Sequence, residues 1–275
     1  MQRWWHILLT HSIFVSLCAG ALCVQSFHLM NVPVNWHLCL SIGCFTLGGY
    51  NLYWMISTFH FSARSLLQVF FNQPLHTTLF FLGTIAGIGF ILPYPNTYPW
   101  LFATVVAGCM YALPLFISQS GISLRVPGAV KTILLAVVWA IATVWVPLSA
   151  NEFSWALIPL LFLRFSFIFM LNIIFDVGDA ANDKQLNVRS LVTDNPIQRI
   201  HFWMGITICM YALAVVCFVW LSLDVLTGMF LLLLLWPVVV LYKKAFSKQL
   251  YHFYYLYTDG LMLCSAVATY LAGIA

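Results

Sequence analysis

The sequence predicts an all-α polytopic membrane protein, in which nine transmembrane helices form a bundle around a central cavity. Composition is the first reason, because hydrophobic residues make up 63% of the 275 positions and charged residues only 7%. The second is the mean hydropathy of +0.97, since no soluble core needs so much apolar surface. The third is that the apolar residues fall into runs long enough to cross a bilayer.

The apolar runs divide the chain into nine expected spans, at residues 5–24, 36–58, 77–93, 98–118, 131–148, 154–175, 201–222, 225–242 and 254–273. No polar or low-complexity linker separates them, so we interpret residues 1–275 as a single transmembrane domain. The first run also resembles a signal peptide, because Arg3 precedes an apolar core and small residues follow near Ala19. Its cleavage would leave eight spans, and the charge pattern favours its retention.

The basic residues predict the orientation. With a cytoplasmic N-terminus, ten of the eleven Lys and Arg residues fall on the inner side. The charged residues of the external loops are then Glu152 and Asp224, with no Lys or Arg among them. This distribution follows the positive-inside rule and predicts an external C-terminus in a bacterial inner membrane protein. The eleventh basic residue, Arg164, lies within a span and must face the bundle interior or snorkel. We attribute the net charge of +4 to this topology, and expect membrane lipids and no nucleic acid as partners.

An acidic stretch ends the sixth apolar run, and three of the chain's seven acidic residues, Asp176, Asp179 and Asp183, fall there. On a helix, Asp179 lies about 60° and Asp183 about 20° around the axis from Asp176. Asn172 adds another oxygen on the same face. Carboxylates this close repel each other unless a cation lies between them, and hard oxygen ligands suit Mg²⁺. The pattern predicts a Mg²⁺ site with the three aspartates as ligands, and the alternative is an acidic helix end wetted by solvent.

These residues carry a resemblance to a known family. Asp176-x2-Asp179-x3-Asp183, followed by Lys184, Val188, Arg189 and Ser190, resembles the second aspartate-rich motif of the UbiA superfamily of intramembrane prenyltransferases. The segment from Tyr111 to Pro147 resembles the fourth and fifth helices of that family, and its matching positions are Tyr111, Pro114, Arg125 and Lys131. Residues 257–260 in the last span are also similar to the family. The resemblance covers most of residues 40–273 and implies the UbiA-like fold.

The chain departs from the family at the first aspartate-rich motif. That motif has an Asn followed by Asp at the next, fourth and eighth positions. Here Asn51 is present, but those positions hold Leu52, Met55 and Phe59. No carboxylate lies between Met1 and Ala150 that could take their place. One of the two metal half-sites is therefore missing, and the resemblance implies one Mg²⁺ site rather than two.

The family's reaction moves an isoprenyl group from a prenyl diphosphate to a lipophilic, usually aromatic, acceptor, and the resemblance implies the same reaction here. The leaving diphosphate develops negative charge that metal and basic side chains must neutralise. The implied catalytic residues are Asp176, Asp179, Asp183 and Asn51, and the implied substrate-binding residues are Arg64, Arg125, Lys131, Lys184, Arg189 and Tyr111. Arg64 is the candidate substitute for the missing metal, and a plain positive-inside anchor is the competing interpretation.

A second hypothesis keeps the fold without the reaction. In it, the protein is a catalytically reduced relative that binds a lipid or quinone-like molecule, or a structural subunit of a membrane complex. The missing first motif favours this hypothesis, whereas three carboxylates on one helix face count against a pure scaffold. Asp259, at the start of the last span, is either a helix-capping charge or a wall of the polar cavity.

Overall fold

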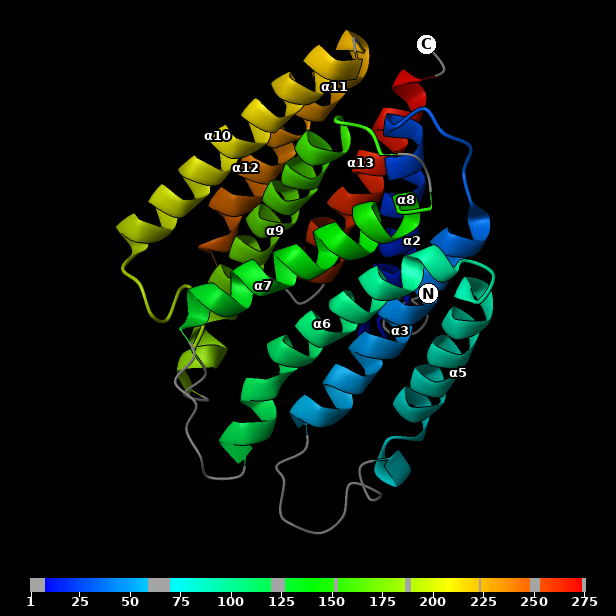
Figure 1. The fold of residues 1–275 in the computed structure, drawn as a ribbon. Helices are drawn as coiled ribbons and strands as arrows, with labels where there is room; N and C mark the ends of the chain where they lie inside the picture. The colour runs from blue at the N-terminus through cyan, green and yellow to red at the C-terminus, as the bar shows by residue number, and fades with distance from the viewer. Residues whose placement is uncertain are drawn as a thin grey trace.

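The structure is a computed structural model that describes residues 8–58, 70–119, 127–150, 153–185, 189–222, 224–247 and 253–273 (Figure 1). Over these ranges the chain is helical apart from short connections, and it contains no strand. The predicted all-α class is therefore confirmed for the described part of the chain. Two predicted substrate contacts, Arg64 and Arg125, lie outside the described residues, as does Phe59.

The long helices are α2 (Ile13–Leu29), α3 (Trp36–Thr58), α5 (Pro74–Ile91), α6 (Tyr98–Gln119), α7 (Gly128–Ala140), α9 (Leu157–Gln185), α10 (Ile197–Ser222), α11 (Val225–Leu233), α12 (Leu235–Ala245) and α13 (Asp259–Ala272). Shorter elements join or extend them: η1 (Pro95–Thr97), the π-helical turn η2 (Ile141–Trp145), α8 (Val146–Leu148) and the π-helical turn η3 (Phe253–Thr258). A helix thus lies in each of the predicted apolar ranges. The first predicted span differs most in position from its helix, because Ser12, with a φ of 59°, interrupts the helical backbone just before α2 begins.

Five helical segments in the described part are long and apolar enough to cross a membrane: Pro74–Ile91, Gly128–Leu148, Leu157–Ala181, Ile197–Ser222 and Val225–Ala245. The second of them runs from α7 through η2 and α8, and the last joins α11 to α12. The chain is accordingly a helical integral membrane protein. The crossing of the membrane by nine helices stays a prediction.

Helix α9 forms the centre of the bundle. Within its most apolar window 72% of the residues are buried, against 17% for α5. Helix α9 packs against α7, α10 and α12, while α2 packs against both α3 and α13. Helix α5 lies at the edge of the bundle (Figure 1), and α3 is the one long helix that packs extensively against it in the described part of the chain.

Small residues bring α3 and α5 close together. A Cβ on Gly83 would lie 2.6 Å from the carbonyl oxygen of Cys44 and 2.8 Å from the backbone nitrogen of Gly48. The Ser41 hydroxyl donates to the carbonyl of Gly87 on α5 at 2.8 Å. Close backbone approach of this kind is typical of helix pairs in membranes. It leaves the far side of α5, including Phe81, exposed to the surroundings.

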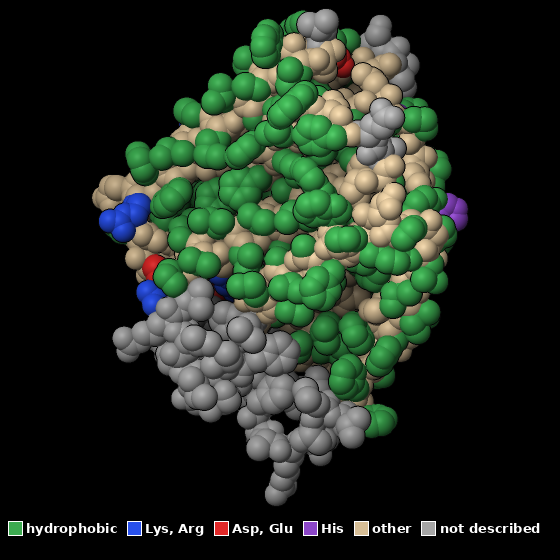
Figure 2. Space-filling model, in the orientation of Figure 1, with side chains coloured by type: hydrophobic (Ala, Val, Ile, Leu, Met, Phe, Trp, Pro, Cys, Tyr) green, Lys and Arg blue, Asp and Glu red, His purple; other side chains and the backbone are tan. Residues whose placement is uncertain are grey.

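Helix ends that lie far apart in the sequence gather at one edge of the bundle. The C-terminal ends of α3, α6 and α9 and the N-terminal ends of α5, α7 and α10 lie along the left and lower edge in Figure 1. Figure 2 shows a largely hydrophobic face, with the visible Lys, Arg and most of the acidic side chains near the same edge. The polar chemistry of the visible face is therefore concentrated where α7 begins and α9 ends.

Candidate functional site

Lys131, in the first turn of α7, faces the acidic end of α9. Its ammonium group interacts electrostatically with the carboxylates of all three motif aspartates. The Lys131 Nζ atom also lies over the ring of Tyr111 from α6, 5.3 Å from the ring centroid, within the range of a cation–π contact. Three helices thus bring one cation, one aromatic ring and three carboxylates together.

Asp176 is the most firmly held of the three carboxylates. The Thr132 hydroxyl donates to its Oδ2 atom at 2.7 Å, and the backbone N–H of Leu191 donates to the same side chain. The Asn172 amide in turn donates to the carbonyl oxygen of Thr132 at 3.3 Å. Asp176 therefore joins α9 to α7, and the hydrogen bonds leave it less able to coordinate a metal than its neighbours. Neither Thr132 nor Leu191 belongs to a motif that the sequence indicates.

Asp179 and Asp183 lie one turn apart at the end of α9. Asp183 is hydrogen-bonded by the Ser190 side chain, and burial raises the pKa of its carboxyl group against the opposing effects of that bond and of Lys131. Asp179 is exposed, and its carboxyl group interacts electrostatically with Asp183 and Lys131. These two carboxylates are the ones that a cation can reach.

The donor set can be compared with what Mg²⁺ requires. Among the described residues, no three His, Cys, Asp or Glu side chains are placed to hold a metal together. The Mg²⁺ site with three aspartate ligands stays a prediction, and in the structure Asp176 is hydrogen-bonded to Thr132. The remaining pair, Asp179 and Asp183, fits a largely hydrated Mg²⁺, which in proteins is commonly held by one or two carboxylates and completed by water and phosphate oxygens.

The segment after α9 folds back onto the start of α7. Arg189 Nε donates to both carboxylate oxygens of Asp194, at 2.9 and 3.1 Å, and the Gly128 N–H donates to Asp194 Oδ2 at 2.8 Å. A Cβ on Gly128 would overlap the backbone of Ser190, so the two segments touch. We call the contact of Arg189, Asp194 and Gly128 the α7 clasp. It fixes the first turn of α7, where Lys131 lies.

Arg189 and Lys184 were expected to bind substrate phosphate. In the structure Arg189 pairs instead with Asp194, although its side chain stays 48% exposed. Lys184 is exposed in the last turn of α9. Neither side chain is brought onto the three carboxylates by a hydrogen bond in the described part of the chain. Both lie at the same end of α9 as the aspartates.

The α7 clasp predicts a pH dependence of stability. Burial alone would raise the pKa of Asp194, but the hydrogen bonds from Arg189 and Gly128 and the Arg189 charge outweigh it and hold the pKa below its ordinary value. Because the folded pKa lies below that of the unfolded chain, about 3.9, the stabilisation is present above that pH and is lost as pH falls through the folded pKa. We expect Asp194→Asn to lower the melting temperature at pH 7, and the difference from the wild-type protein to shrink progressively as the pH falls below about 3.9. A difference that stays constant across this range would contradict the role of the ionised carboxylate.

Asn51 lies away from the aspartates. It is fully buried, its Nδ2 donates to the carbonyls of Leu47 (2.8 Å) and His11 (3.0 Å), and its Oδ1 is 2.6 Å from Nδ1 of His76. Met55, at the fourth position after Asn51 in the degenerate motif, is also fully buried, and its sulfur accepts from the Thr77 hydroxyl at 3.3 Å. This face of α3 therefore packs on α2 and α5, and the structure does not bring Asn51 to the predicted site.

Another face of α3 does approach the site. Tyr53 is hydrogen-bonded to Tyr111, and the centroids of their rings are 5.6 Å apart. Tyr50 accepts a hydrogen bond from the Trp139 indole N–H at 3.3 Å and interacts electrostatically with Asp259, which is buried at the start of α13. Aromatic side chains thus adjoin the polar cluster on the side of the bundle interior. Tyr53 and Trp139 were not singled out from the sequence.

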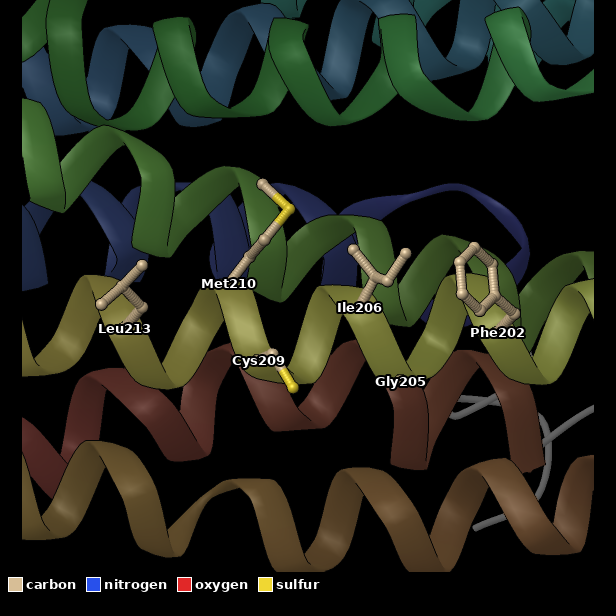
Figure 3. A pocket seen from close by; sticks show the side chains of 6 residues that line it. All are labelled: Phe202, Gly205, Ile206, Cys209, Met210 and Leu213. Carbon is tan, nitrogen blue, oxygen red and sulfur yellow. The ribbon is translucent and has the colours of Figure 1, made fainter.

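A separate apolar hollow lies on α10 (Figure 3), and it is lined by Phe202, Gly205, Ile206, Cys209, Met210 and Leu213. These residues all belong to one helix and offer no charged group. The hollow contains none of the residues of the cluster around Lys131. We assign it no part in the chemistry of the aspartates.

Comparison of this chain with family models, with curated proteins and with solved structures gives no match.

Proposed function

We propose that the protein binds a prenyl diphosphate at the end of the bundle where α7 begins and α9 ends, and transfers the prenyl group to a lipophilic, aromatic acceptor. The observation that carries this proposal is the meeting of Lys131 with three carboxylates and Tyr111 beside an apolar helical bundle. A prenyl diphosphate has a charged head and an apolar tail, and this junction offers a matching environment for each part.

The roles of the side chains follow from their contacts. Lys131 would contact the diphosphate, while Asp179 and Asp183 would hold a Mg²⁺ ion, which when bound helps to neutralise the leaving diphosphate. Asp176 and Thr132 would keep Lys131 in place through the contact of α7 with α9. Tyr111 and Tyr53 would form the aromatic wall beside the reacting end of the prenyl chain and limit the access of water to it.

The orientation and the remaining features of the fold belong to the same proposal. We infer a UbiA-like bundle in which nine helices cross a bacterial inner membrane, with the Lys131 end facing the cytoplasm. Lys243 and Lys244 in the last turn of α12 support this orientation, because basic residues favour the cytoplasmic side. Asp224, at the start of α11, would then lie on the external side together with the C-terminus.

A catalytically reduced lipid-binding protein is the second candidate. The observation that favours it is the closed packing around Asn51 and Met55, which leaves no visible second half-site on that face of α3. Such a protein would bind the diphosphate or a quinone-like lipid without releasing diphosphate. The two candidates therefore differ in turnover.

The test is the release of inorganic diphosphate from geranyl, farnesyl and longer prenyl diphosphates by the purified protein, with and without Mg²⁺ and aromatic acceptors. We expect release that requires Mg²⁺ and falls about 10²–10³-fold when Asp179 and Asp183 are both changed to Asn, as for the loss of a charge-stabilising group. Asp224→Asn is the matched control, because it removes a carboxylate from the far end of the bundle while Asn can still cap α11.

The same samples distinguish the candidates. A melting temperature raised by farnesyl diphosphate and Mg²⁺, without any release of diphosphate, would favour the reduced protein. If the folded protein shows no release of diphosphate and no thermal shift, both candidate functions are contradicted. Hydrolysis of the donor alone is included, because water can replace a missing acceptor.

A further inference from the structure

Arg164 is buried in the apolar interior of α9, within the candidate span Leu157–Ala181. Its side chain has no solvent exposure. One terminal nitrogen, Nη2, donates to the carbonyl oxygen of Leu22 at 3.0 Å and to the hydroxyl of Ser26 at 3.2 Å, both on α2. The Nε and Nη1 atoms have no hydrogen-bond partner in the described part of the chain. Most of the guanidinium's donors are therefore unused.

The charge of Arg164 is also uncompensated. Arginine stays protonated in proteins, and the only ion pair among the described residues joins Arg189 to Asp194. The groups that interact electrostatically with Arg164 are Cys23 and Tyr211, and a thiol and a phenol are neutral at pH 7. A positive charge in the interior of a membrane protein is normally paired or faces water.

The described neighbours of Arg164 direct their hydroxyl hydrogens elsewhere, and none of them accepts a hydrogen bond from Nε or Nη1. The hydroxyl of Ser26 has one hydrogen, which it directs to the carbonyls of Leu22 (3.0 Å) and Thr143 (2.7 Å). Tyr211 donates its own hydroxyl hydrogen to Leu231 on α11 at 3.0 Å. Thr143 belongs to the π-helical turn η2, and such turns are frequent at functional sites. Polar groups of α2, α9 and η2 thus meet around a cation that lacks a counterion.

This region is distinct from the aspartate cluster. Arg164 precedes Asp176 by twelve residues on the same helix, a separation of about 18 Å at the α-helical rise. A diphosphate group bound at Lys131 does not reach it, and the inference does not rest on prenyl transfer.

We propose that Arg164 binds a small monovalent anion in the bundle interior, through the N–H groups of Nε and Nη1. The anion would be of the size of chloride or formate, because Leu22, Cys23 and Tyr211 around the guanidinium are themselves buried. It would supply both the missing charge and the missing hydrogen-bond acceptor.

The test measures the melting temperature of the purified full chain at constant ionic strength, with sodium gluconate replaced stepwise by chloride, bromide or formate. We expect the small anions to raise the melting temperature by about 2–4 °C over gluconate, which is too large for the site. A response to halides alone identifies a halide site, and a response to formate as well identifies a general small-anion site; both support the proposal. The absence of any response in the wild-type protein overturns it.

Two variants and a direct measurement localise the site. Arg164→Gln removes the charge and should abolish the anion response, whereas Arg199→Gln should keep it, because the exposed side chain of Arg199 bonds only to Asn195 in the described part of the chain. An equal response in both variants overturns the proposal. If Arg164→Gln does not fold, a wild-type crystal grown in bromide decides, since anomalous scattering must show an ion beside the Arg164 guanidinium, and a structure without one there contradicts the inference.

Discussion

Replacing Lys131 with methionine should cut prenyl diphosphate turnover by about 10²–10³-fold, the usual cost of losing a group that stabilises developing charge. Lys131 is the cation that interacts with all three motif carboxylates, so the substitution also leaves these carboxylates facing the incoming diphosphate without a positive neighbour. The value of kcat/KM for diphosphate release measures the effect. Lys131→Arg, which keeps the charge, should retain part of the activity.

Lys243→Met is the matched control for this substitution, because it removes an exposed lysine from the end of α12 and should leave turnover unchanged. A purely structural role for Lys131 makes a different prediction. In that case, Asp183→Asn would relieve the repulsion among the carboxylates and restore both stability and turnover to the Lys131→Met protein. A double-mutant cycle on melting temperature and on kcat/KM distinguishes the two roles. Restored turnover would contradict the assignment of Lys131 to the substrate.

Most helices of this protein can be predicted from the sequence, because membrane spans need long apolar runs and the turns between them carry recognisable residues. Helix α5 begins at Pro74, and Asp224 caps the start of α11, because its side chain accepts from the Thr227 N–H at 3.0 Å. The start of α2 was less readable. Hydropathy alone does not reveal the left-handed conformation of Ser12 that precedes it.

The candidate site could be predicted from the sequence in part. The spacing of the aspartates places them on one side of a helix, and the family resemblance drew Lys131 and Tyr111 into the same hypothesis. The hydrogen-bond partners of the aspartates could not be predicted, because Thr132, Ser190 and Leu191 come close to the aspartates only through the packing of α7 and of the chain after α9. A threonine or serine in an apolar or loop segment carries no sequence signal for such a contact.

Asn51 shows why a motif position does not fix a side chain's surroundings. Residues 51 and 53 differ by about 200° around the helix axis, so only one of them can face the site. In this chain apolar Met55 continues the face of Asn51 and packs against Thr77, while Tyr53 meets Tyr111. Without carboxylates to keep this face hydrated, hydrophobic packing is its more stable arrangement.

Gly128→Ala should both destabilise the protein and disrupt the site. The added Cβ would overlap the carbonyl group of Ser190 and lie 2.6 Å from its Cα. Backbone cannot move aside as the end of a flexible side chain can, so we expect an overpacking cost of about 1–3 kcal/mol. At about 2–4 °C for each kcal/mol in a protein near this size, the melting temperature should fall by several degrees.

The functional effect of Gly128→Ala follows from the α7 clasp. Separation of Gly128 from Ser190 would also separate Thr132 from Asp176 and Lys131 from Asp183, since each pair spans the same contact. We therefore expect weaker thermal stabilisation by farnesyl diphosphate and lower turnover at a temperature where the variant is still folded. Gly205→Ala is the control, because its Cβ would meet nothing within 4 Å and alanine favours a helix over glycine. Equal stability and turnover in the two variants would show that the close approach of α7 to Ser190 does not hold the site together, and the arrangement of Lys131 over the aspartates would then need another cause.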